Sequence, residues 1–257
     1  MSSKAVIIVS FGTANLDGLN FLEKFEEEVR SSLSEKYYVC KAFTSSAIAN
    51  VLLNKYGKIV PRLEEVLFSL GNEGYKEVYI RPLHIIEGSE FLSVKNVIKE
   101  YNYSFSKINL GKPIMGKDEK TLIEGCNLIA NSIEKNLEKN KSIVLVGHGS
   151  KTIDTESYDR LKDTFNKKGF KSVYMGTLEG KIRKEDILKK LLKDNIKEVL
   201  ISPVLMLPGN HIKKDILGDK NSWKALFEEN NIKVNYTSKS LIEYDEIRKF
   251  YIDKIKS

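Results

Sequence analysis

The chain has 257 residues, 41% of them hydrophobic and 30% charged, and a formal net charge of +7 at pH 7. This composition is that of a globular protein and excludes a disordered or fibrous chain. No apolar run approaches the roughly 18 residues of a membrane-spanning helix, and the segment after Met1 lacks the features of a signal peptide. We therefore expect a cytoplasmic protein with no membrane association.

The positive charge does not indicate a nucleic-acid-binding protein. Lys and Arg residues alternate with Asp and Glu along the helical segments instead of gathering in blocks. The excess of positive charge suits the binding of a small polyanionic ligand. The two cysteines, Cys40 and Cys126, belong to no C-x-x-C pattern, so we expect neither a disulfide framework nor a thiolate zinc site.

Apolar runs of strand length alternate with apolar stripes of helical spacing through the first half of the chain. An N-cap is expected at Asn15 or Asp17, Pro61 suits a first helical turn, and Ser89 is expected to cap a further helix. The predicted strands are residues 5–10, 37–43, 77–81 and 108–110. The predicted helices start near residues 15, 46, 61 and 89, with a long helix at 118–137.

The second half repeats this pattern. Residues 197–211 match residues 76–90, with Lys-Glu-Val, Pro and Gly at the same places, and residues 143–150 resemble residues 7–13. Further strands are expected at 172–177 and 232–236, and helices around 158–165, 187–192, 222–229 and from 243. Alternating strands and helices predict an α/β fold of two similar halves, each a four-stranded parallel sheet flanked by helices. We place the halves at residues 1–138 and 139–257, with the active-site cleft between them.

Three polar residues of the second half follow the carboxyl ends of predicted strands: His148, Glu179 and His211. Ends of neighbouring parallel strands meet at one sheet edge, and imidazole with carboxylate is a ligand set for divalent cobalt, nickel, iron or zinc. The sequence therefore predicts a metal site. Each residue also has an ordinary alternative: a His-Gly turn, a carboxylate at a helix N-terminus, and a first-turn histidine bonded to the backbone.

The equivalent places in the first half hold Phe11, Ser45 and Glu90. Glu90 is a candidate acid in the cleft, although a solvated carboxylate is an equal alternative. An apolar slot for a flat ligand is predicted at Ser10, Phe11 and Thr13. The remaining histidine, His84, is expected to be a hydrogen-bonded core residue rather than a fourth ligand.

Several common catalytic motifs are absent from the sequence. There is no G-x-x-x-x-G-K-[ST] loop, no G-x-G-x-x-G fingerprint and no G-x-S-x-G elbow. Nucleotide hydrolysis, dinucleotide chemistry and serine-based acyl transfer are therefore not expected. We expect no organic cofactor.

The ordered motifs resemble the anaerobic cobalt chelatases of cobalamin biosynthesis, the sirohydrochlorin cobaltochelatases of CbiK type. The resemblance covers nearly the whole chain, and the motif set is specific although each piece is weak alone. The matching segments are Ser10-Phe11-Gly12-Thr13, Ala42-Phe43-Thr44-Ser45, the segment from Pro82 to Glu90, Gly147-His148-Gly149-Ser150, Leu178-Glu179-Gly180, and the segment from Gly209 to Lys224.

This resemblance implies an ATP-independent type II chelatase, related in fold to ferrochelatase, that inserts Co²⁺ into sirohydrochlorin. It implies metal binding by His148, Glu179 and His211, proton acceptance by His148, and an accessory acid at Glu90. Asn210 departs from the family pattern, where Asp is expected before the histidine, and this change bears on how the metal ligand is oriented.

The sequence leaves the metal, the class of function, the substrate-binding cations and the oligomeric state open. Fe²⁺ or Ni²⁺ could replace Co²⁺ as substrate, and a non-catalytic metal- or tetrapyrrole-binding protein is a different class of explanation, as is a scaffold whose histidines are structural. Cleft-facing cations would attract the carboxylates of sirohydrochlorin, and Arg81 and Lys151 are candidates by position. The expected partners are the tetrapyrrole and a divalent metal, with no nucleic acid. Whether the chain forms a homo-oligomer is not readable.

Overall fold

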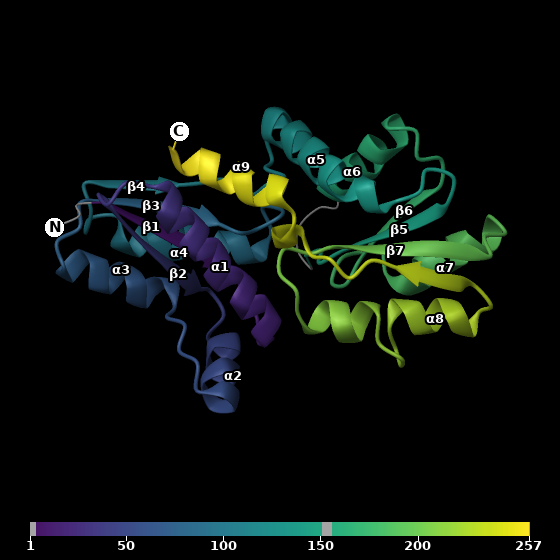
Figure 1. The fold of residues 1–257 in the computed structure, drawn as a ribbon, viewed down its shortest axis with the longest axis horizontal. Coiled ribbons are helices and arrows are strands. Elements are labelled where there is room, and N and C mark those ends of the chain that lie inside the picture. The colour runs from purple at the N-terminus through teal and green to yellow at the C-terminus, as the bar shows by residue number, and fades with distance from the viewer. Residues whose placement is uncertain (1–3, 151–155, 257) are drawn as a thin grey trace. The chain divides into compact units, whose positions relative to one another are not determined.

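The computed structural model describes residues 4–150 and 156–256 as two α/β units (Figure 1). Unit 1 comprises Met1–Gly116 and Arg248–Ser257, and unit 2 comprises Lys117–Ile247. Within the described residues no helix is long and apolar enough to cross a membrane. The lysine candidate at position 151 lies outside the described residues.

Each unit contains one parallel four-stranded sheet, as predicted. The strand orders are β2-β1-β3-β4 and β6-β5-β7-β8, and all strand pairs are parallel. The strands of unit 1 are β1 (Lys4–Ser10), β2 (Tyr37–Phe43), β3 (Glu77–Pro82) and β4 (Lys107–Leu110). Those of unit 2 are β5 (Ser142–Gly147), β6 (Val173–Thr177), β7 (Glu198–Val204) and β8 (Lys233–Tyr236).

Helices connect these parallel strands, as crossover connections require. The α-helices are α1 (Leu16–Ser32), α2 (Ser46–Tyr56), α3 (Leu63–Asn72), α4 (Ser89–Tyr101), α5 (Glu119–Ile133), α6 (Glu156–Lys167), α7 (Lys184–Lys193), α8 (Trp223–Glu229) and α9 (Asp245–Lys256). Short helical segments lie at Glu134–Asn136, His211–Ile216 and Leu241–Glu243, and the second of these is a π-helix.

Both faces of each sheet are covered, which explains why the central strands are apolar throughout. In unit 1, Ala5, Ile7 and Val9 of β1 pack with Leu67 of α3 and Val94 of α4. Figure 1 shows α1 on the opposite face of this sheet. In unit 2, one face of the sheet packs against buried residues of α7 and α8, namely Ile187, Leu191, Trp223 and Phe227.

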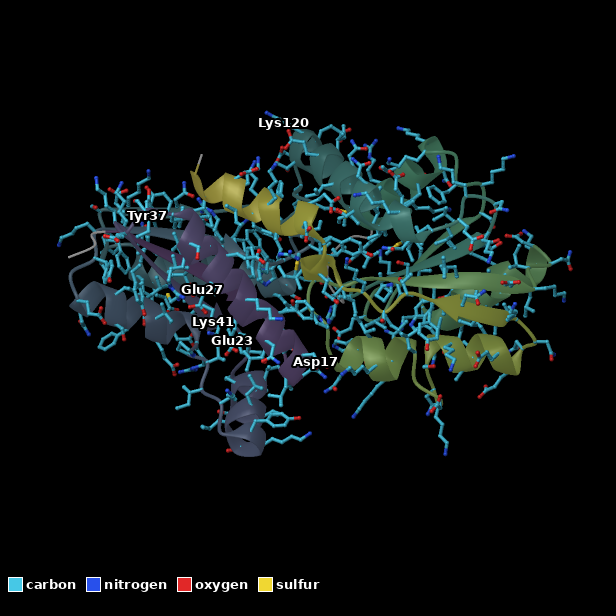
Figure 2. The ribbon with its side chains drawn as sticks, in the orientation of Figure 1. Asp17, Glu23, Glu27, Tyr37, Lys41 and Lys120 are labelled. Carbon is cyan, nitrogen blue, oxygen red and sulfur yellow. The ribbon has the colours of Figure 1, made fainter. Side chains whose placement is uncertain are left out.

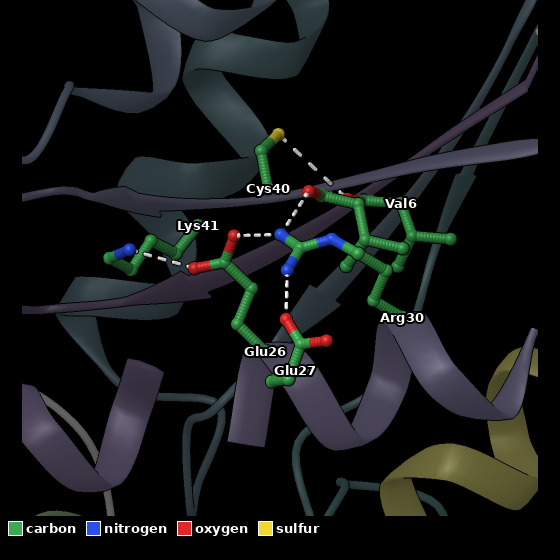
Figure 3. Close-up of polar contacts among 7 residues, drawn as sticks. Val6, Glu26, Glu27, Arg30, Cys40 and Lys41 are labelled. Carbon is green, nitrogen blue, oxygen red and sulfur yellow. Dashed lines mark hydrogen bonds and ion pairs between the residues drawn. The ribbon is translucent and has the colours of Figure 1, made fainter. Parts of the chain in front are cut away.

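A charged cluster attaches α1 to β2 (Figure 3). Glu26 is 9% exposed and binds Arg30 at 2.7 Å and Lys41 at 2.7 Å. Arg30 also donates to the Val39 carbonyl at 3.2 Å. Because each charge has a partner, the buried carboxylate is compensated. The acidic residues on the outer part of α1, including Asp17 and Glu23, lie at the surface (Figure 2).

The division into units differs from the expected boundary at residue 138. Helix α5, which closes the first half of the repeat, belongs to unit 2, where Arg160 of α6 binds Glu119 at 3.1 Å. Most of α9, which closes the second half, belongs to unit 1, where Tyr251 contacts the Phe25 ring of α1. The two closing helices are therefore exchanged between the halves.

The internal repeat extends to individual hydrogen bonds. The Ser45 amide donates to the Phe11 carbonyl at 3.2 Å, and the Glu179 amide donates to the His148 carbonyl at 2.8 Å. These bonds confirm the predicted correspondence of the two turns. Among the predicted caps, Asn15 accepts the Asp17 amide at 2.9 Å. Ser89 is not the cap of α4, because Gly88 occupies that position and Ser89 is already helical.

Arg81 is a structural residue and not a substrate-binding one. It is 5% exposed, and its guanidinium donates to the Asn109 side chain at 2.8 Å and to the Lys254 carbonyl at 3.1 Å. Burial lowers the pKa of Arg81. The prediction that Arg81 attracts substrate carboxylates is therefore wrong, because its donors are directed to β4 and to the last turn of α9.

Arg81→Met is expected to lower the free energy of unfolding by about 2 kcal/mol, because it leaves buried carbonyls without their charged donor. Urea denaturation of the full chain measures this change. Arg160→Met is the control, since it removes an ion pair in which the Arg160 side chain is 35% exposed. Equal effects of the two substitutions would show that Arg81 has no special role in holding α9.

Candidate active site

The candidate site lies where β5, β6 and β7 of unit 2 end. β5 is the central strand of the three and pairs with β6 on one side and β7 on the other. His148 directly follows β5, and Glu179 lies two residues after β6. The connection after β7 leads to His211, the first residue of the π-helix. The three residues therefore follow the carboxyl ends of neighbouring strands of one sheet.

The structure brings the two imidazoles together. The ring centroids of His148 and His211 are 5.2 Å apart, and the ring planes are inclined at 81°. Two imidazoles bound to one tetrahedral cation, with metal–nitrogen distances of about 2.1 Å, would have centroids roughly 5 Å apart. His148 is half-buried in its turn and His211 is 48% exposed at the side chain. The spacing of the pair thus suits joint binding of a metal ion.

Glu179 is tied to His148 through the backbone. Besides the bond from the Glu179 amide to the His148 carbonyl, the Leu178 amide donates to the Gly147 carbonyl at 3.0 Å. Within residues 4–150 and 156–256, however, no three His, Cys, Asp or Glu side chains form a group that could hold a metal. A three-ligand site with Glu179 therefore stays a prediction.

Tyr158 of α6 supports the turn that carries His148. Its ring packs against Gly147 so closely that an added Cβ there would lie 2.4 Å from the Tyr158 Cε1 atom. Its hydroxyl accepts a hydrogen bond from the Gly149 amide at 3.3 Å. The tyrosine is 3% exposed, so a rigid ring backs the residues on both sides of His148. Sequence reasoning identified Tyr158 only as a helix residue.

A carboxylate lies beside the second imidazole. The Nδ1 atom of His211 is 2.6 Å from Oδ2 of Asp215, one helical turn further along the π-helix. Asp215 was not among the predicted site residues. A histidine followed four residues later by aspartate was a visible signal, but a π-helix was not expected at residues 211–216.

The predicted residues of unit 1 differ in exposure. Glu90 lies in the first turn of α4 and is half-buried. Phe11 is 39% exposed, whereas Ser10 is 2% and Thr13 is 6% exposed. The Thr13 hydroxyl accepts the Asn15 amide at 3.2 Å, in the turn that precedes α1. Of the three residues of the expected slot, Phe11 presents the most side-chain surface.

His84 is buried as predicted, but it is not hydrogen-bonded. It is 5% exposed, and neither of its ring nitrogens has a hydrogen-bond partner among the described residues. The ring lies edge-on to Phe91, with centroids 6.0 Å apart. Burial lowers the pKa of His84 to about 4. The histidine is thus neutral at physiological pH and lies in an apolar environment.

Solved structures define the class of this fold. The chain is similar to SirB from Bacillus subtilis with Fe³⁺, with a TM-score of 0.65, 16% identity and coverage of 98% of this chain and 94% of that one. It is also similar to CbiX, described as the terminal enzyme for biosynthesis of siroheme in denitrifying bacteria, with a TM-score of 0.58, 14% identity and 98% coverage of both chains. The architecture is therefore that of the sirohydrochlorin chelatases.

Sequence comparisons identify the family. Residues 4–257 match the family model described as cobalt chelatase (CbiK), so the chain belongs to the cobalt chelatase family. Sirohydrochlorin cobaltochelatase CbiKC of Nitratidesulfovibrio vulgaris is 24% identical over 261 residues, covering 99% of this chain and 90% of the relative. Sirohydrochlorin cobaltochelatase of Salmonella typhimurium is 24% identical over 253 residues, covering 97% and 94%.

Proposed function

We propose that this protein inserts Co²⁺ into sirohydrochlorin without ATP, as a step of anaerobic cobalamin biosynthesis. The observation that carries the proposal is the pair of imidazoles 5.2 Å apart at the strand ends of unit 2, in a chain of the cobalt chelatase family. The cytoplasmic location expected from the sequence is part of the proposal. Cell fractionation followed by immunoblotting checks it.

The proposed reaction exchanges one cation for two protons. Co²⁺ loses part of its water shell to His148 and His211, with Glu179 as the proposed third ligand. The two pyrrole N–H groups of the macrocycle lose their protons as nitrogen–cobalt bonds form. Imidazole is a common proton acceptor in enzymes, so His148 is the proposed acceptor of one proton once it has released the metal to the ring. Solvent water takes the other proton. A site with few protein ligands releases the metal more easily than a closed one.

The residues of unit 1 are assigned to the macrocycle in this proposal. Phe11 offers an exposed aromatic face for a flat ring, while Ser10 and Thr13 shape the turn beneath it. Glu90 is the proposed accessory acid. Glu90→Gln and Phe11→Ala test these assignments separately, through the insertion rate and through the KM for sirohydrochlorin.

A panel of metals tests the proposed function. Purified protein is mixed with sirohydrochlorin and Co²⁺, Fe²⁺, Ni²⁺ or Zn²⁺, and the initial rate is followed by the change in the absorption spectrum of the macrocycle. We expect many turnovers per protein and the highest rate with Co²⁺. A spectral change that stops at one equivalent would indicate a binding protein, and a higher rate with Fe²⁺ or Ni²⁺ would identify another metal substrate.

Tyr158→Phe is expected to reduce the insertion rate about fivefold, because one hydrogen bond to the His148 turn, worth about 1 kcal/mol, is lost. Tyr174→Phe is the control, since that hydroxyl binds Asp194 at 2.7 Å on the same unit. The rates of both variants are measured with Co²⁺ at saturating sirohydrochlorin. An unchanged rate in Tyr158→Phe would show that ring packing alone supports the turn.

A further inference from the structure

The contact between Asp215 and His211 is a short hydrogen bond between two exposed side chains of one helix. The Asp215 Oδ2 atom lies 2.6 Å from Nδ1 of His211, and the two side chains are 53% and 48% exposed. Neither burial nor packing forces them together. The bond therefore depends on the course of the backbone between the two residues.

The π-helix provides that course. Leu217 donates its amide to the Ile212 carbonyl at 3.0 Å, a bond of the i to i+5 type. The segment ends at Ile216 with Leu217 as its C-cap. At the next residue, Gly218, an added Cβ would lie 2.4 Å from the Lys214 carbonyl oxygen. Ile212 and Ile216 are buried and anchor an adjacent face of the same segment. His211 and Asp215 are thus held on one face, one turn apart.

The chemistry of the pair determines which ring nitrogen of His211 carries the hydrogen. An ionised carboxylate can only accept hydrogen bonds, so a hydrogen bond to Asp215 places a hydrogen on Nδ1 of His211. A neutral imidazole with hydrogen on Nδ1 carries its lone pair on Nε2. A metal ligand histidine is commonly oriented in this way by a carboxylate outside the metal's own ligand set.

We propose that Asp215 is a positioning residue that holds His211 in the Nδ1–H form, so that the Nε2 lone pair is available to the metal ion beside His148. This inference rests on the proposed function, because it takes His211 to be a metal ligand.

The experiment reads the tautomer and the metal affinity in the same protein. Full-length protein is labelled with ¹⁵N-histidine, and the side-chain nitrogen shifts are recorded without metal at about pH 8.5, above the ordinary titration range of histidine. The chain has 3 histidines, so His211→Gln assigns the signals. We expect His211 to carry its hydrogen on Nδ1, and Asp215→Asn to shift the ring toward the Nε2–H form.

Co²⁺ binding to the same variants provides the second readout. We expect Asp215→Asn and Asp215→Ala to weaken Co²⁺ affinity by about 10-fold or more. Asp219→Asn is the control, because it removes the same charge four residues further on, from a side chain that is 96% exposed. Asn210→Asp is expected to change the affinity less than Asp215→Asn does.

The outcomes separate this inference from the proposed function. If His211 of the wild-type protein carries its hydrogen on Nε2, or if Asp215→Asn and Asp219→Asn weaken Co²⁺ binding equally, the positioning role is wrong even when insertion activity is present. If His211→Gln leaves Co²⁺ binding and insertion unchanged, the assignment of His211 as a metal ligand fails. Circular dichroism of each variant confirms that the fold is retained.

Discussion

Replacing His148 by alanine is expected to lower the initial rate of Co²⁺ insertion into sirohydrochlorin by at least about 100-fold, the usual lower range for loss of a proton-transfer residue. The substitution removes the proposed proton acceptor and one half of the imidazole pair. The protein should still fold, because His148 is only half-buried in a turn that is held by backbone hydrogen bonds from Leu178 and Glu179. Insertion is measured spectrophotometrically under anaerobic conditions.

The other two histidines provide matched comparisons. His211→Ala should reduce insertion on a similar scale, whereas His84→Leu should leave it within about threefold, since a buried side chain without contacts to the substrate contributes through stability alone. Thermal unfolding of all three variants verifies folding. A His148→Ala protein that folds and keeps wild-type rates would contradict the assigned roles and favour structural histidines.

His84 is expected to make the protein sensitive to acid. The pKa of His84 is lowered from 6.5 to about 4 by burial, so between these values the unfolded chain binds a proton that the folded protein excludes. The free energy of unfolding therefore has its full value above pH 6.5 and decreases as the pH falls toward 4. The difference between a pKa of 6.5 and one of about 4 corresponds to a loss of roughly 3 kcal/mol in the free energy of unfolding.

His84→Leu tests this contribution, because the repeat places Leu205, which is 5% exposed, at the equivalent position of unit 2. The variant should be more stable than wild type by roughly 1–3 kcal/mol at neutral pH, since it removes two unpaired buried nitrogens. It should also lose much of the decline between pH 6.5 and 4. Urea denaturation across this range measures both effects. Parallel curves for the two proteins would show that His84 does not carry the acid sensitivity.

The alternation of strands and helices could be predicted from the sequence because it follows from burial alone. Parallel strands covered on both faces are apolar along their whole length, and β2 was predicted with the observed bounds Tyr37–Phe43. The internal repeat also showed, without coordinates, that the turns carrying His148 and Glu179 correspond to the turns at Phe11 and Ser45 of the first half. Position at the strand ends was enough to predict that His148 and His211 would meet.

Other features depend on contacts that the sequence does not contain. The π-helix at His211–Ile216 has no distinctive residue pattern, so the bond between His211 and Asp215 was missed. The hydrogen bonds expected for His84 are absent among the described residues, because the sequence does not show which groups surround a buried side chain. The lysine candidate at position 151 lies in residues 151–155, outside the described part of the chain.

The exchange of α5 and α9 has a consequence for how the protein can be divided. A cut after Asn136 would separate the two halves of the duplication, but each fragment would keep a helix that packs in the other compact unit. Each piece would lack one helix of its own unit. The two pieces should therefore aggregate when produced singly and reassemble when co-expressed, as in fragment complementation.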